Sequence, residues 1–198
     1  MSVLLTNLRN AVITAFVLAI VVFAIIVAAG QTSDFAMGFA AYILRFLHVL
    51  AGIMWIGLLY YFNFVQTPSM PKIPDEHKPA IGKVIAPAAL FYFRWAAMAT
   101  MVLGLLLAAH NGYLVDALLL GSQTGHLSII GIGMWLGLIM WFNVWFIIWP
   151  NQKKVLGIVT VEADVKARAG KVAGLASRAN TVLSVPMLLC MIGQSHFG

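Results

Sequence analysis

The chain has 198 residues, of which 62% are hydrophobic and only 9% carry a charged side chain. A soluble domain has about a quarter charged residues, so this composition excludes an ordinary soluble protein and indicates an integral membrane protein. The net charge of +6 would suit a nucleic-acid-binding protein, but the basic residues gather in two connections between apolar segments, which excludes that partner.

Five apolar segments are long enough to cross a hydrocarbon layer of about 30 Å, which takes about 20 helical residues. Their apolar residues run without the alternation of a barrel strand, so we predict an all-α integral membrane fold with five transmembrane helices. The first segment is long for a signal peptide and is expected to be a retained helix. Residues 1–198 are expected to form a single membrane domain, with spans at 11–29, 42–64, 87–109, 127–149 and 181–197.

The connections after the second and fourth segments hold most of the basic residues. Because basic loops stay on the cytoplasmic side, this asymmetry predicts a cytoplasmic N-terminus and a C-terminus outside the membrane. Residues 151–180 mix charges with alanine and glycine, and we predict that they form a short amphipathic helix on the cytoplasmic surface. Residues 65–86 are rich in proline and are predicted to be extended or turn-like.

An internal repeat relates the second segment to the fourth. The pattern W-x-G-L-x-x-x-F-N begins at Trp55 and again at Trp135, 80 residues later. Each copy has a histidine upstream, and the segment that follows each copy ends near another histidine. We therefore predict a duplicated helical hairpin (helices 2–3 and 4–5) after an N-terminal helix, with a shared site at the interface between the halves.

Four of the five histidines fall at the same end of different apolar segments, the end predicted to lie outside: His48, His110, His126 and His196. Each one alone is compatible with an ordinary interfacial residue. Ionisable side chains within a membrane are costly and often mark function, so four at one level favour a metal or haem site. The fifth, His77, lies in a basic connection and is expected to be solvated.

Imidazole binds zinc, copper and iron alike. No carboxylate lies within the spans to complete a zinc or di-iron site, whereas methionines in the third and fifth spans keep copper open as an alternative. We favour one or two b-type haems held by these histidines. Trp55 and Trp135 are candidate walls of the haem slot. Arg45, one helical turn from His48, fits either a partner for a haem propionate or a boundary residue that reaches water.

Three stretches resemble the membrane portion of the bacterial membrane-bound urate hydroxylases, the urate oxidase N-terminal family. They are R-F-L-H-V-L-A-G-I-M-W-I-G from Arg45, N-V-W-F-I-I-W-P-N-Q-K-K from Asn143, and the stretch from S-R-A-N-T at Ser177 to Phe197. The resemblance implies an oxidoreductase that passes electrons to a fused cytochrome c domain, with His48, His126 and His196 on matching positions. This chain contains no C-x-x-C-H motif, and we expect it to lack that domain.

These observations together predict a haem b-binding electron-transfer protein or subunit in a bacterial inner membrane, with a periplasmic C-terminus. Its expected partners are the lipid bilayer and either a cytochrome c or a larger respiratory or photosynthetic membrane complex. Two alternatives stay open, namely a urate-hydroxylase-like oxidoreductase and an accessory subunit without a cofactor.

Overall fold

The structure is a computed structural model that describes residues 7–29 and 35–197. Within these ranges the chain forms helices and turns and no strand, which confirms the predicted all-α class. Five of the described helices are long and apolar enough to cross a membrane, as predicted. These five helices are Leu8–Ala28, Gly38–Lys72, Lys78–His110, Ile129–Val155 and Ala163–His196. Each extends past the predicted apolar span at one end or at both, because flanking polar residues continue the helix.

The chain separates into two compact units, Met1–Ala40 and Ala41–Gly198. The first unit contains α2 (Leu8–Ala28), which begins after Asn7. The Asn7 side chain accepts a hydrogen bond from the Arg9 backbone N–H at 2.9 Å, a standard N-cap. No residue of α2 is buried.

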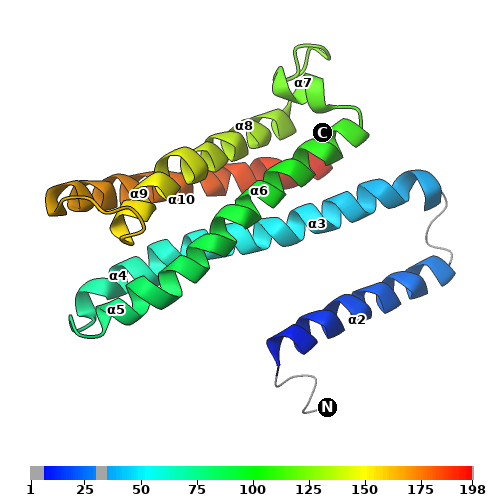
Figure 1. Ribbon diagram of the computed structural model, residues 1–198. Coiled ribbons are helices and arrows are strands. Elements are labelled where there is room, and N and C mark those ends of the chain that lie inside the picture. The colour runs from blue at the N-terminus through cyan, green and yellow to red at the C-terminus, as the bar shows by residue number, and fades with distance from the viewer. Residues whose placement is uncertain (1–6, 30–34, 198) are drawn as a thin grey trace. The chain divides into compact units, whose positions relative to one another are not determined.

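The second unit is built from four long helical spans (Figure 1). They contain α3 (Phe35–Tyr60, which starts in the first unit), α6 (Ala86–His110), α8 (Ile129–Phe142) and α10 (Ala163–Phe197). The short helices α4 (Thr67–Ser69), α5 (Lys78–Ala80) and α9 (Trp149–Val155) lie at one end, which we call the basic end. The short helix α7 (Leu114–Leu118) lies at the other, which we call the α7 end.

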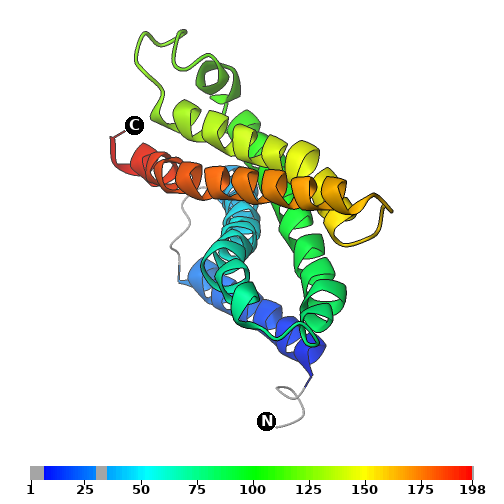
Figure 2. The same ribbon diagram turned by 90° about the vertical axis from the view of Figure 1, so that its left-hand side faces the viewer.

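Helices α8 and α10 lie side by side along their length (Figure 2). Their close approach depends on glycine, since a Cβ on the buried Gly133 would lie 3.1 Å from the Cβ of Cys190 on α10. The main core then joins the spans through the buried side chains of Trp55 and Leu59 on α3, Phe93 on α6 and Met140 on α8. Small residues therefore set the helix spacing, and large ones fill the centre.

Two of the spans change to π-helix next to the repeated motif, at η1 (Tyr61–Gln66) and η4 (Asn143–Ile148). A π turn shifts the backbone hydrogen-bond ladder from the regular α-helical pattern. Asn63 Nδ2 donates to the Leu59 carbonyl at 2.9 Å, and Asn180 Nδ2 donates to the Met140 carbonyl at 2.9 Å. A side-chain amide thus donates to a carbonyl shortly before η1 and shortly before η4. A third π-helix, η3 (Ile81–Ile85), precedes α6.

Both asparagines of the repeated motif also bond to α10. Asn63 Nδ2 donates to Ser177 Oγ at 2.8 Å, and Asn143 Nδ2 donates to Asn180 Oδ1 at 2.8 Å. The two copies differ in burial, however, since Trp55 is 1% exposed and Trp135 is 45% exposed. Helix α3 buries its tryptophan face, whereas α8 buries its glycine face against α10, so the internal duplication stays a prediction.

The structure corrects two predicted connections. Residues 151–180 were expected to form a short helix on the surface, but α10 runs unbroken from Ala163 into the apolar segment because no proline separates the two halves. Its polar half packs inward at Ala169 and Ala173, both buried. Residues 65–86 are largely helical instead of extended, because Pro68 and Pro79 occupy first-turn positions where proline is tolerated.

We expect Asn180→Leu to lower the free energy of unfolding in detergent by about 1–3 kcal/mol, because it leaves the Asn143 side-chain amide without its partner and removes one of the donors to the Met140 carbonyl. Asn180 is fully buried, so water cannot replace the lost bonds. The control is Thr181→Val, which removes only the hydroxyl bond from Thr181 to Ser177 of the same helix. Equal stability losses in the two variants, measured by circular dichroism during denaturation, would contradict the bridging role of Asn180.

Candidate functional site

His48 is held in the contact between α3 and α6. Its Nδ1 lies 2.9 Å from the backbone carbonyl oxygen of Thr100. Because a carbonyl only accepts, Nδ1 must carry the hydrogen of this bond. Thr100 is itself buried, and its hydroxyl donates to the Ala96 carbonyl at 2.7 Å, so the carbonyl that orients His48 belongs to a fixed helical segment.

Gly104 makes room for the His48 ring one turn further along α6. A Cβ at residue 104 would lie 2.8 Å from Cε1 of His48 and 3.0 Å from its Nδ1. Both distances are below a normal van der Waals contact, so the ring occupies the space that any side chain here would need. The Thr100 carbonyl and the Gly104 surface together fix the position and the tautomer of the imidazole.

This arrangement leaves the Nε2 lone pair of His48 available. Nε2 has no hydrogen-bond partner among the described residues. Metal-ligating histidines commonly donate one ring N–H to a backbone carbonyl, which orients the ring and presents the other nitrogen to the metal. His48 therefore fits a ligand to haem iron or to another metal ion that accepts imidazole.

The other three predicted histidines lie nearer the surface. His110 is the last residue of α6, His126 lies in the connection before α8, and His196 is near the end of α10; all three are exposed. The Nδ1 of His196 lies 3.1 Å from Ser195 Oγ and 3.2 Å from the Ile192 carbonyl oxygen. Across the described ranges, no group of three or more histidine, cysteine or acidic side chains is placed to hold a metal ion.

The remaining predicted site residues have different environments. Arg45 is exposed and lies one helical turn from His48 on α3. Trp55 belongs to the main core, whereas the exposed Trp135 donates from Nε1 to the Leu118 carbonyl at 3.0 Å. Trp135 thus anchors α7 to α8, and the two tryptophans of the repeat do not share one role.

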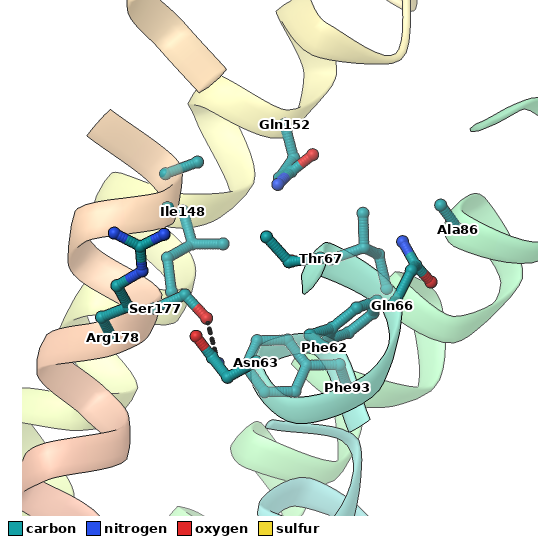
Figure 3. Close-up of a pocket in the computed structure, with 13 residues that line it drawn as sticks. Phe62, Asn63, Gln66, Thr67, Ala86, Phe93, Ile148, Gln152, Ser177 and Arg178 are labelled. Atoms are coloured by element: carbon teal, nitrogen blue, oxygen red, sulfur yellow. Dashed lines mark hydrogen bonds between the residues drawn. The ribbon is translucent and has the colours of Figure 1, made fainter. Parts of the chain in front are cut away.

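The sequence analysis missed a polar pocket at the basic end, with a volume of about 90 Å³. Figure 3 shows polar side chains from η1, α4, α9 and α10 around it. No single segment signals this pocket, because each polar residue by itself resembles an ordinary interfacial residue. The N-Q-K-K and S-R-A-N-T stretches were the available signal. Its polar lining comprises Asn63, Gln66, Thr67, Gln152, Ser177 and Arg178.

Comparison with known families matches residues 120–198 to the family described as urate oxidase N-terminal. The match covers α8, η4, α9 and α10, and it confirms the predicted resemblance for this part of the chain. It includes His126 and His196 but not His48. Searches of curated proteins and of solved structures gave no match.

We expect Gly104→Ala to lower the free energy of unfolding by about 1 kcal/mol, although alanine normally stabilises a helix. The added methyl group would displace the His48 ring and break its bond to Thr100. The control is Gly52→Ala, whose Cβ would meet only Thr100 Cγ2, at an ordinary 3.8 Å. Thermal unfolding in detergent measures both, and a Gly104→Ala protein as stable as Gly52→Ala would show that the ring is not tightly held.

Proposed function

We propose, from the match of residues 120–198 to the urate oxidase N-terminal family, that this chain is a membrane redox protein that binds b-type haem. The observation that carries the proposal is the His48 imidazole, which is fixed through Nδ1 with Nε2 left to bind a metal. Bound haem would supply a one-electron carrier inside the membrane. The likeness to a family of oxidases supports this redox role.

Several residues of the chain would have separate roles in binding haem. His48 would bind the haem iron through Nε2, the Thr100 carbonyl would keep its ring in the required tautomer, and Gly104 would leave space for the ring. A second histidine to hold the haem would come from His110, His126 or His196, which end or precede spans at the α7 end. Arg45, one turn from His48, would pair with a haem propionate.

The basic end would face the cytoplasm, and the α7 end the periplasm, of a bacterial inner membrane. The five apolar helices support embedding in a lipid bilayer. A haem near the α7 end would then lie close to the outer surface. A cytochrome c or a larger membrane complex on that side would accept its electrons over a short distance.

We expect His48→Ala to abolish or strongly reduce haem binding, because the ring held by Thr100 is lost. Purified protein would be examined by reduced-minus-oxidised spectra, a pyridine haemochrome assay and iron analysis. The control is His77→Ala, which removes the exposed histidine in the connection before α5 and should leave the haem content unchanged.

Full haem content in His48→Ala would remove this residue as a ligand. Copper without iron in the wild-type protein would favour the copper alternative. A wild-type protein with neither haem nor metal would instead support an accessory subunit without a cofactor.

A second candidate function is oxidation of urate, favoured by the description of the matching family. The chain would then take electrons from urate and deliver them to a cytochrome c. Urate consumption by the purified protein, measured together with reduction of added cytochrome c, tests this candidate. Haem without urate consumption would leave electron transfer as the function.

A further inference from the structure

An arginine on α6 stacks on a tryptophan of α9. Arg94 lies in the first half of the apolar helix α6, and its guanidinium carbon is 3.7 Å from the centroid of the Trp149 ring. The ring of Phe91, one turn earlier on α6, has its centroid 5.7 Å from the same carbon. Such cation–π contacts hold the guanidinium in place, but they leave its positive charge without a counter-ion.

The guanidinium of Arg94 has hydrogen-bonding capacity that the protein does not use. Its Nε and Nη1 have no partner among the described residues, and the described ion pairs are formed by other side chains. Arg94 is partly exposed, so its third nitrogen, Nη2, is the part of the group that a ligand can reach. A charge within a membrane span is costly when it is unpaired, and an anion from outside the chain would supply the missing partner.

A second cation lies over the same tryptophan. The Nζ of Lys153 is 5.9 Å from the Trp149 ring centroid, so Lys153 and Arg94 lie within about 10 Å of each other, the Debye length at 0.1 M salt. Lys153 forms no ion pair within residues 7–29 and 35–197 either. Two like charges at this separation repel each other, and an anion beside them would be attracted by both. The pair of cations therefore favours an anionic ligand.

Aromatic side chains place this pair at the level of the lipid headgroups. Trp95 on α6 is about half exposed and meets Trp145 of η4 edge to face, with ring centroids 5.4 Å apart. Tryptophans gather where the hydrocarbon layer of a membrane meets the headgroups. Trp149 is the first residue of α9, a short helix of the basic end. The most abundant anion at this level of a membrane is the phosphate of a lipid.

An exposed apolar face of α6 leads from this level towards the α7 end. Its residues recur at intervals of four, seven and four, which places them on one side of the helix, and each is about half exposed: Phe91, Trp95, Val102 and Leu106. A phospholipid bound at Arg94 would cover this face with an acyl chain, whereas a soluble anion would leave it uncovered. The apolar face therefore favours a lipid as the source of the anion.

We propose that Arg94, Trp149 and Lys153 form a binding site for an anionic phospholipid in the leaflet at the basic end. Arg94 donates from Nη2 to the lipid phosphate, Trp149 holds the guanidinium in place, and Lys153 adds a second positive charge. Basic sites between transmembrane helices on the cytoplasmic side bind such headgroups, and the basic end is the one proposed to face the cytoplasm. The site depends neither on haem nor on urate oxidation.

The test measures lipid binding to the full chain in detergent micelles by native mass spectrometry, which gives the affinity of the first bound lipid. The probes are phosphatidylglycerol and phosphatidylcholine with identical palmitoyl and oleoyl chains. Both contain a phosphate, but only phosphatidylglycerol has a net negative charge, because choline neutralises the other. Phosphatidylglycerol should bind to the wild-type protein at least about 10-fold more tightly than phosphatidylcholine.

Two variants locate the binding. Arg94→Gln should weaken phosphatidylglycerol binding about 10-fold or more, because it removes both the charge and the hydrogen bond to the phosphate. Lys153→Gln should weaken it about fivefold, because it removes only the second charge. The control is Arg178→Gln, which removes an exposed arginine at the same end that does not stack on Trp149 and should change the affinity less than about twofold. Phosphatidylcholine binding should stay unchanged in all three variants.

Equal affinity of the wild-type protein for the two lipids would overturn the proposal, and so would an unchanged preference for phosphatidylglycerol in Arg94→Gln. If Arg94→Gln loses the binding of both lipids through misfolding, Lys153→Gln decides, and an unchanged preference there overturns the site. Excess inorganic phosphate tests the source of the anion. Displacement of phosphatidylglycerol by phosphate, beyond the effect of sodium chloride at the same ionic strength, would assign the site to a soluble anion and reject the lipid.

Discussion

Asn180 is completely buried, and its side chain forms the hydrogen bonds that connect α10 to α8 and to the start of η4. Its Oδ1 accepts from Asn143, and its Nδ2 donates to the Met140 carbonyl. Asn180 is fully buried, so its amide group depends on these protein partners for its hydrogen bonds. The Met140 carbonyl, at the point where α8 changes into η4, thus accepts from the Asn180 side chain as well as from the Asn143 backbone N–H. The glycine face of α8 can then approach α10 closely.

A similar arrangement occurs beside η1, where Asn63 and Ser177 line the pocket. Asn63 satisfies the Leu59 carbonyl beside η1 and also reaches Ser177 on α10. Asn63 Nδ2 donates one hydrogen to the backbone of its own helix and the other to Ser177 on α10, so its Oδ1 remains as an acceptor. The requirement of a dry interior for satisfied backbone groups thus leads directly to a polar recess at the basic end.

The two ends of the second unit offer different chemistry. Towards the α7 end, a single imidazole is oriented by a backbone carbonyl and lodged against a glycine. At the basic end, amides, a hydroxyl and an arginine surround a small polar space. The proposed haem suits the first environment, where one imidazole nitrogen stays available.

The sequence by itself determined the all-α class, the five apolar helices and the resemblance to the urate oxidase N-terminal family, because hydropathy and short motifs are local properties of the chain. It also selected His48, but it could not distinguish this residue from His110, His126 and His196. Only the tertiary structure showed that difference, since the Thr100 carbonyl and Gly104, which contact the His48 ring, belong to α6 and not to the helix of His48. The unequal burial of Trp55 and Trp135 and the pocket around Asn63 and Ser177 were likewise decided by packing between distant segments, which no local pattern encodes.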